Sequence, residues 1–267
     1  MDALDRDFGS SAGQGRSVMI APTLPGGIAA CLFDLDGVLT QTAKVHAAAW
    51  KEMFDAFLRE RAARAGEPFR PFEIATDYVK YVDGRLREDG VRTFLASRGI
   101  TLPEGTTGDP PAADTVHGLG TRKNTLVVEI MRRDGVEAYP GSMRFVEAVR
   151  AAGLDRAVVS ASRNCREALA AAGIAGLFEV VIDGIVAGER QLHGKPAPDT
   201  FLAAAADLGT EPARCAMFED AIAGVEAGRA GGFGWVVGVD RVGQADALRA
   251  GGADVVVEDL AELLEDR

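Results

Sequence analysis

The chain has 267 residues, 47% hydrophobic and 26% charged, which is typical of a soluble globular protein with one or two domains. A formal net charge of −11, without a Lys- or Arg-rich stripe, argues against nucleic acid or an anionic membrane as the main partner. No apolar run approaches the ~20 residues that span a bilayer, and the acidic N-terminus does not resemble a signal peptide. Three scattered cysteines predict neither disulfides nor a metal site, so we expect a cytoplasmic protein.

The first part of the chain is predicted to contain one strand and several helices. Residues 1–27 are rich in Gly, Ser, Asp and Pro, and we expect a flexible arm. An apolar run at 28–35 predicts a buried strand. Helical periodicity then predicts helices at 43–64, 73–82, 88–98 and 122–134, around a Pro- and Gly-rich loop at 101–114.

From residue 140 onward, helices and strands alternate. Strands are expected at 156–160, 179–182, 214–218, 234–239 and 254–257, with a last helix at the C-terminus. This alternation indicates an α/β fold with a Rossmann-like, doubly wound parallel sheet. The first strand is separated from this series, so we predict a core domain (28–41 and 140–267) with an inserted helical cap domain (42–139). Ligands of such sheets bind at the carboxyl ends of the strands.

Acidic residues follow two of the expected strands at that edge. Asp34 and Asp36 end the first strand, and Glu219 and Asp220 end another. Carboxylates this close repel each other unless a cation lies nearby or one of them is an acid–base. Mg²⁺ is commonly held by a few carboxylates together with phosphate and water. The alternative interpretation is that these residues cap turns and helices.

Ser160 and Lys195 lie at equivalent places. Ser160 follows a strand and precedes a helix N-terminus, where a hydroxyl and free N–H groups bind phosphate. Pro196 restricts the backbone of Lys195, and we expect a cis bond between the two. A capping serine and a surface lysine are the alternatives. Acids, a hydroxyl, a lysine and further acids at the ends of different strands favour a phosphoryl-transfer site over independent capping.

These residues resemble the four motifs of the haloacid dehalogenase superfamily. The first is Asp34-Leu35-Asp36-Gly37-Val38-Leu39-Thr40, and the others are Ser160, Lys195 and Glu219-Asp220, in order. The resemblance extends from residue 29 to the C-terminus. It implies that Asp34 is a nucleophile forming an aspartyl-phosphate and that Asp36 is the general acid–base.

The resemblance also implies a cofactor, Mg²⁺. Its ligands would be Asp34, the main-chain carbonyl of Asp36, and Asp220 with Glu219. Ser160 and Lys195 would hold the phosphate being transferred.

Further positions are similar to the β-phosphoglucomutase branch of that superfamily. They are Thr42, His46, Trp50, Gly84, Arg87, Lys123, Ala161, Ser162, Arg163 and Asn164. The resemblance implies that Arg87, with the residues at 162–164, binds the phosphate that is not transferred. It also implies that Thr42, His46 and Lys123 form a relay that aligns Asp36 when the cap closes on a sugar. A mutase needs both functions, because it holds a bisphosphate at two ends and excludes water.

Some features depart from that branch and keep alternatives open. Gln41, Asp83 and Gly90 replace its usual aspartate, lysine and serine, and the cap is longer at 101–114. Conversion of β-glucose 1-phosphate to glucose 6-phosphate is the first hypothesis, and a sugar-phosphate phosphatase is the second. A non-catalytic sugar-phosphate-binding protein is disfavoured by the intact motifs. His46 and Arg87 also have plain alternatives, as a polar residue on a core face and as an exposed arginine.

Overall fold

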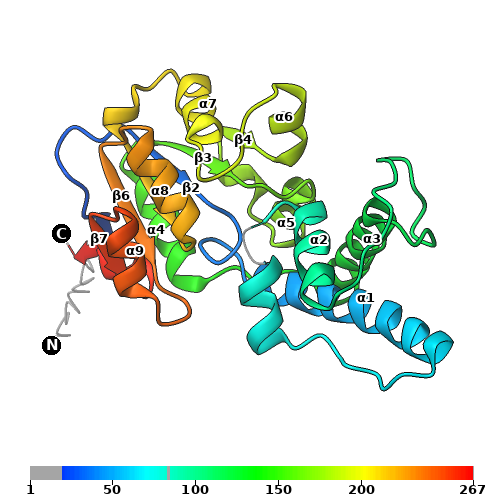
Figure 1. Cartoon of the computed structure of the whole chain (residues 1–267). Coiled ribbons are helices and arrows are strands. Elements are labelled where there is room, and N and C mark those ends of the chain that lie inside the picture. The colour runs from blue at the N-terminus through cyan, green and yellow to red at the C-terminus, as the bar shows by residue number, and fades with distance from the viewer. Residues whose placement is uncertain (1–19, 83–84, 267) are drawn as a thin grey trace, which may run out of the picture.

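The computed structural model describes residues 20–82 and 85–266 (Figure 1). Its centre is a six-stranded, all-parallel sheet in the order β4-β3-β2-β5-β6-β7. The strands are β2 Ala30–Phe33, β3 Asp155–Val159, β4 Val180–Ile182, β5 Cys215–Glu219, β6 Trp235–Val239 and β7 Val255–Val257. The chain runs outward from β2 in both directions, so the doubly wound α/β fold is confirmed and β2 lies at its centre, between β3 and β5.

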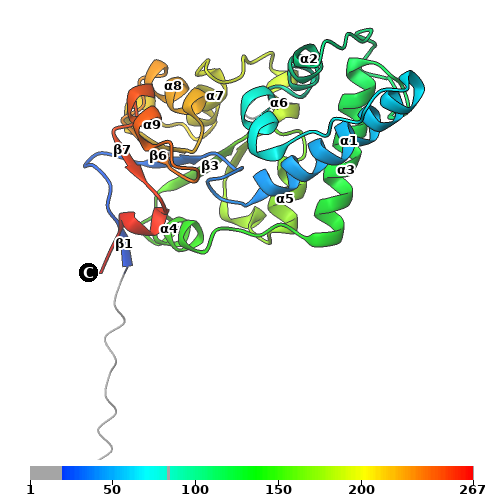
Figure 2. The same ribbon diagram turned by 60° about the horizontal axis from the view of Figure 1, so that its bottom comes forward.

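Helices cover both faces of this sheet (Figure 2). They are α4 Pro140–Ala151, α5 Cys165–Ala171, α6 Gly184–Glu189, α7 Asp199–Asp207, α8 Ile222–Ala230 and α9 Ala245–Gly251. Residues of β2 alternate between the two layers: Phe33 packs with α4 and α5, whereas Leu32 packs with α7, α8 and α9. Burial on both faces explains why the strand reads as an unbroken apolar run.

A separate helical lobe lies to one side of the sheet (Figure 1). We use this name for α1 Thr42–Ala65, the π-helix Ile74–Val82, α2 Arg87–Ser97 and α3 Val116–Asp134. Its own apolar cluster is centred on Phe54, whose ring lies 5.3 Å from that of Phe72 and 4.2 Å from that of Phe94. Residues of α1 and α3, among them Ala49 and Val127, also join the cluster beneath α4 and α5, so the lobe is packed against the sheet layer.

Several elements differ from expectation, among them α6 and α9, which were not predicted. Helix α3 begins at Val116, because the hydroxyl of Thr115 accepts from the Gly118 N–H at 2.9 Å and caps it. The expected C-terminal helix is wrong. A short 3₁₀ helix, Leu260–Leu263, is followed there by β8 Leu264–Asp266, which pairs antiparallel with β1 Ile20–Pro22.

Part of the expected N-terminal arm is therefore paired with the C-terminal end of the chain. The Thr23 N–H also donates to the Leu263 carbonyl at 2.8 Å. Residues 1–19 lie outside the described residues. Within the described ranges, no helix has both the length and the apolar character that crossing a membrane requires.

Replacing Phe54 by Ala should destabilise the helical lobe by about 3–5 kcal/mol, because a buried ring is lost and its site can collapse only in part. Urea unfolding followed by tryptophan emission measures this, since Trp50 stacks on Phe54 at 5.2 Å. The control is Val242→Ala, at a side chain that is 76% exposed, with an expected change within about 0.5 kcal/mol. Equal losses in both variants would contradict the assignment of Phe54 to a packed cluster.

Candidate active site

The loop after β2 folds back on itself at the carboxyl edge of the sheet. The Asp34 N–H continues the ladder by donating to the Phe218 carbonyl of β5 at 2.9 Å. Gly37 then turns the chain with φ +88°, and its N–H donates to the Thr40 carbonyl at 2.8 Å. A Cβ at Gly37 would lie 1.9 Å from Oδ2 of Asp220, so only glycine fits between the two acidic motifs.

Lys195 joins two carboxylates in the buried centre of the site. Its Nζ lies 2.5 Å from Oδ1 of Asp34 and also contacts Oε1 of Glu219, the last residue of β5. The Lys195-Pro196 bond is cis, as expected. The other oxygen of Glu219 accepts from the Ala221 N–H at 3.2 Å. The side chains of Asp34, Lys195 and Glu219, which we call the buried charge cluster, therefore meet from three separate segments.

The buried charge cluster shifts the pKa of each member. Burial raises the pKa of Asp34 to about 6 and that of Glu219 to about 7, although Lys195 opposes both shifts. Burial alone would lower the pKa of Lys195, but Asp34 and Glu219 outweigh it and raise the pKa above its ordinary value. The lysine therefore stays charged, but its attraction for the two carboxylates does not outweigh the cost of burying them.

A second group of residues connects Asp36 to the helical lobe. Thr42, the first residue of α1, donates its hydroxyl to Oδ1 of Asp36. One turn further on, Nδ1 of His46 lies 3.0 Å from Nζ of Lys123 on α3. Lys123 is buried, and its ammonium lies 5.0 Å above the ring of Trp50. The structure thus forms two of the contacts that the predicted relay requires, Thr42–Asp36 and His46–Lys123.

Burial also shifts the pKa values in this group. It raises the pKa of Asp36, against the effects of Thr42 and Lys123. Burial, with the Lys123 charge nearby, lowers the pKa of His46 well below its usual range. His46 is therefore neutral near pH 7, and its Nδ1 and Nζ of Lys123 share a hydrogen bond whose direction depends on the histidine tautomer.

The loop after β3 contains two serines whose hydroxyls accept hydrogen bonds from main-chain N–H groups of the same loop. Ser160 is buried, and its Oγ accepts from the Ser162 N–H at 3.1 Å. Ser162 in turn accepts from the Asn164 N–H at 3.2 Å, and Asn164 donates to Oδ1 of Asn124 on α3 at 2.9 Å. The last contact ties this loop to the helical lobe. Ala161 and Arg163 are exposed between these anchored positions.

The predicted grip on the second phosphate is only partly assembled. Arg87 begins α2, and its guanidinium is paired with Glu88 at 2.9 Å rather than with the loop at 162–164. Gly84 and Asp83 lie outside the described residues. Trp50 is 3% exposed and stacked on Phe54, which agrees with a packing role for this residue.

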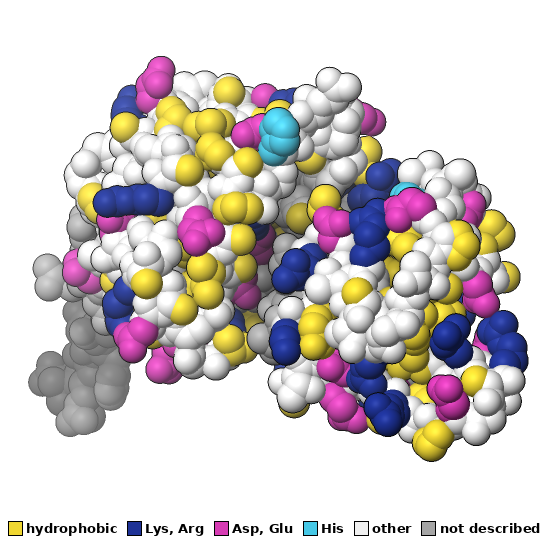
Figure 3. Space-filling model, in the orientation of Figure 1, with side chains coloured by type: hydrophobic (Ala, Val, Ile, Leu, Met, Phe, Trp, Pro, Cys, Tyr) yellow, Lys and Arg dark blue, Asp and Glu magenta, His cyan; other side chains and the backbone are white. Residues whose placement is uncertain are grey.

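A hollow separates the sheet from the helical lobe in the space-filling view (Figure 3). Asp and Glu side chains lie deep in it, and Lys and Arg side chains line its helical side. Such a distribution suits an anionic ligand that approaches together with a cation at the acidic end.

The acidic residues at this edge of the sheet are the candidate ligands for a metal ion. In the part of the chain that the structure describes, no three His, Cys, Asp or Glu side chains gather as a ready-made metal site. A cation here would therefore use fewer side chains, supplemented by a main-chain oxygen and water, which is how Mg²⁺ is usually bound. Asp34 and Glu219 share the single ammonium of Lys195, and Asp220 lies beside Gly37 at the same edge, so these oxygen donors fit a hard divalent cation.

Sequence reasoning missed two residues that hold these loops in place. Arg241 donates from Nε to the Gly37 carbonyl at 2.8 Å, and its guanidinium lies 3.7 Å above the ring of Tyr139. Gln244 donates to the main-chain carbonyl of Asp220 at 2.9 Å. Both residues follow the carboxyl end of β6, and that position in the sequence could have indicated that they lie near the site.

Lys123 should make stability depend on pH. Burial lowers its pKa from 10.5 to about 7, so between these values the unfolded chain holds a proton that the folded chain lacks. The free energy of unfolding should then rise with pH in that window, by up to about 1.4 kcal/mol per pH unit. The change Lys123→Met removes this contribution. Urea unfolding of both proteins at pH 6.5, 7.5 and 8.5 should show a difference that grows with pH, and a constant difference would contradict the account.

Comparison with known proteins places this site in a family. The family model described as haloacid dehalogenase-like hydrolase matches residues 28–232. The chain is 57% identical over 244 residues to a β-phosphoglucomutase of Mycobacterium bovis, covering 90% of this chain and 93% of that protein. It is 30% identical over 234 residues to the β-phosphoglucomutase of Bacillus subtilis, covering 88% and 91%.

A solved structure agrees with these sequence matches. The crystal structure of β-phosphoglucomutase from Clostridium difficile superposes with a TM-score of 0.68 at 26% identity, covering 88% of this chain and 93% of that one. The chain belongs to the haloacid dehalogenase-like hydrolase family, in its β-phosphoglucomutase-like branch.

Proposed function

We propose that this protein is a β-phosphoglucomutase, which converts β-glucose 1-phosphate to glucose 6-phosphate through the 1,6-bisphosphate. In this proposal residues 28–41 and 140–267 form the catalytic core, and residues 42–139 form a cap that closes over the sugar. The observation that carries it is the bond from Thr42 to Asp36, because it connects the acid–base directly to the first helix of the cap. The identity with the Mycobacterium bovis enzyme supports the same activity.

The chemistry follows from the two aspartates. Oδ of Asp34 attacks the 1-phosphorus of glucose 1,6-bisphosphate, and the sugar oxygen O1 leaves with a proton from Asp36, giving an aspartyl-phosphate and glucose 6-phosphate. In the return step the free 6-hydroxyl of a β-glucose 1-phosphate gives its proton to Asp36 and attacks the phosphorus on Asp34, which regenerates the bisphosphate. Lys195 and Ser160 hold the phosphate in both directions. The raised pKa of Asp36 suits a group that carries a proton between steps.

Mg²⁺ is the proposed cofactor. Asp34, the main-chain carbonyl of Asp36, and Asp220 with Glu219 would hold it. When bound, it would neutralise the repulsion between the Asp34 carboxylate and an anionic phosphoryl group. Lys195 already reduces this repulsion from its side of the buried charge cluster.

The cap is proposed to favour a sugar over water as acceptor. Thr42, His46 and Lys123 would set the position of Asp36 on closure. Binding of the phosphate that is not transferred is assigned to Arg87, Ser162, Arg163 and Asn164, and Gly84 and Ala161 are assigned to substrate binding more generally. The ligand is thus a small sugar phosphate. A reducing, cytoplasmic setting is proposed from the three buried free cysteines.

A sugar-phosphate phosphatase is the second candidate. It is favoured by the pairing of Arg87 with Glu88, because an engaged arginine gives a weaker grip on a distant phosphate. Water would then accept the phosphoryl group from Asp34.

A split assay should separate the two candidates. With Mg²⁺, β-glucose 1-phosphate and a trace of glucose 1,6-bisphosphate, glucose 6-phosphate should form much faster than free phosphate. Arg87→Ala should lower mutase turnover by roughly 100-fold and phosphatase turnover far less, because only the mutase needs both phosphates held. The exposed neighbour Arg85, changed to Ala, is the control. Dominant phosphate release, or equal losses in the Arg87 variant, would support the phosphatase.

Fluoride complexes of aluminium or beryllium should bind together with Mg²⁺, as mimics of the phosphoryl group on Asp34. Fluorine NMR and a rise in melting temperature would report binding without any turnover. Omission of Mg²⁺ or the change Asp34→Asn should abolish both signals. Binding that persists without Mg²⁺ would rule out the metal role proposed here.

A further inference from the structure

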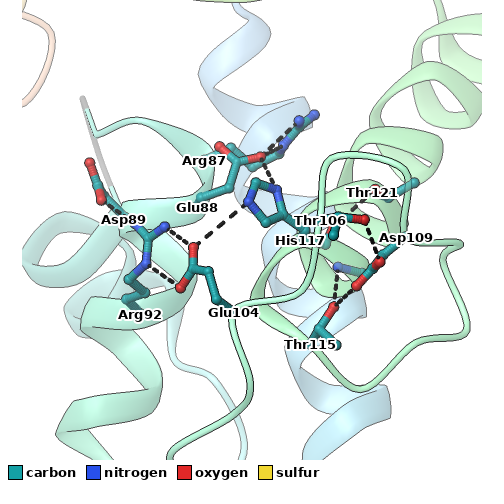
Figure 4. Close-up of polar contacts among 11 residues, drawn as sticks. Arg87, Glu88, Asp89, Arg92, Glu104, Thr106, Asp109, Thr115, His117 and Thr121 are labelled. Carbon is teal, nitrogen blue, oxygen red and sulfur yellow. Dashed lines mark hydrogen bonds and ion pairs between the residues drawn. The ribbon is translucent and has the colours of Figure 1, made fainter.

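The guanidinium of Arg87 is held by the side chain of the next residue. Its Nε and its Nη2 lie 3.0 and 2.9 Å from the same oxygen, Oε1 of Glu88 (Figure 4). The two side chains are 27% and 23% exposed, so water screens this pair only in part. On α3, a Cβ at Gly120 would lie 3.3 Å from both Nε of Arg87 and Oε1 of Glu88, so the pair rests against the bare backbone of that helix.

Glu88 has a second partner, which contacts the same carboxylate oxygen as Arg87. Nδ1 of His117, on α3, lies 3.9 Å from Oε1 of Glu88, and its Nε2 lies 3.7 Å from Oε1 of Glu104 (Figure 4). The main-chain N–H of His117 also donates to the main-chain carbonyl of Glu104, at 3.2 Å. The imidazole therefore stands between two carboxylates, one beside the proposed phosphate grip and one on the long loop at 101–114.

Arg92 anchors the loop end of this network. Its guanidinium contacts both oxygens of Glu104, with Nε 3.1 Å from Oε2, and its Nη1 lies 2.5 Å from Oδ1 of Asp89. An unbroken series of polar contacts thus runs from the loop through His117 to Glu88 and Arg87. This gives the loop, which lengthens the cap, a physical connection to the phosphate-binding arginine.

We propose that Glu88 is a positioning residue that sets specificity by competing with the distal phosphate of the substrate for Arg87, and that His117, held by Glu104, is the partner to which Glu88 turns when Arg87 is released. This rests on the proposed function, in which Arg87 binds the phosphate that is not transferred. A phosphate dianion displaces the carboxylate, because it offers more charge and bidentate geometry to the guanidinium. An unphosphorylated molecule or water offers no anion and leaves the pair closed.

The test is calorimetric binding of glucose 6-phosphate, with Mg²⁺ present, to the full chain and its variants. Glu88→Gln keeps the size of the side chain and removes its charge, so Arg87 is freed and the Kd should fall about five-fold, as expected for loss of a partly exposed competing pair. A merely structural contact would give the opposite sign. Glu129→Gln is the matched control: it removes the same charge from an exposed position of α3 that lies outside this network, and it should change the Kd less than about two-fold.

Two further variants separate this inference from the proposed function. Arg87→Ala should weaken binding of glucose 6-phosphate. Adding Glu88→Gln to that variant should not lower the Kd, because there is no arginine left for Glu88 and the phosphate to compete for. If Arg87→Ala weakens binding but Glu88→Gln does not tighten it, the competition is wrong and the grip stands. If Arg87→Ala leaves the Kd unchanged, the grip and this inference both fail.

The role of His117 is measured in the same way. His117→Leu should weaken binding of glucose 6-phosphate about two- to three-fold, because Glu88 loses its alternative partner and stays on Arg87. The effect should vanish in the Glu88→Gln background. An unchanged Kd, or an equal loss in both backgrounds, would overturn the part assigned to His117 and the loop.

Discussion

The buried ammonium of Lys195 is the interaction on which the rest of the site depends. It brings together a carboxylate from the end of β2 and one from the end of β5, both taken out of water. Removing one partner of such a cluster leaves an uncompensated buried charge, at a cost of about 3–5 kcal/mol. This arrangement requires that β2 and β5 be neighbours in the sheet. It also requires glycine at positions 37 and 224, where a Cβ would collide with Asp220 and Glu219, respectively. The carboxylates around the lysine favour a divalent cation, and the cation together with Lys195 would attract an anionic phosphoryl group.

The second organising feature is the short connection between Asp36 and the helical lobe, which is made by the chain itself and by the hydrogen bond to Thr42. Asp36 accepts a hydrogen bond from Thr42, the first residue of α1, so the proposed acid–base is linked directly to that helix. Arg87 and Glu88 lie on the same lobe, where the proposed function assigns Arg87 to the phosphate that is not transferred. If the lobe moves on substrate binding, as proposed for the cap, both functions would respond together, and catalysis would depend on the correct sugar.

Much of this site was predictable, because the ends of parallel strands meet at one edge. That rule predicts that Asp34 and Glu219 lie close together, and both contact Lys195 in the structure. Lys195 itself was expected at a strand end and instead lies in the loop between α6 and α7. The rule does not predict contacts that depend on the conformation of loops. The ion pair of Arg87 with Glu88 and the hydrogen bond from Arg241 to the Gly37 carbonyl were therefore missed. The pairing of β1 with β8 joins opposite ends of the chain, and neither segment carries a local pattern that indicates it.

The most direct test of the account is trapping of the phosphorylated enzyme. The protein would be mixed with Mg²⁺ and glucose 1,6-bisphosphate labelled in its phosphates, quenched in acid, and digested for peptide mapping. The account predicts a label on the peptide that contains Asp34, released by hydroxylamine as expected of an acyl phosphate, and absent in Asp34→Asn. A label that persists in that variant, or that maps to another residue, would contradict the central claim that Asp34 carries the phosphoryl group.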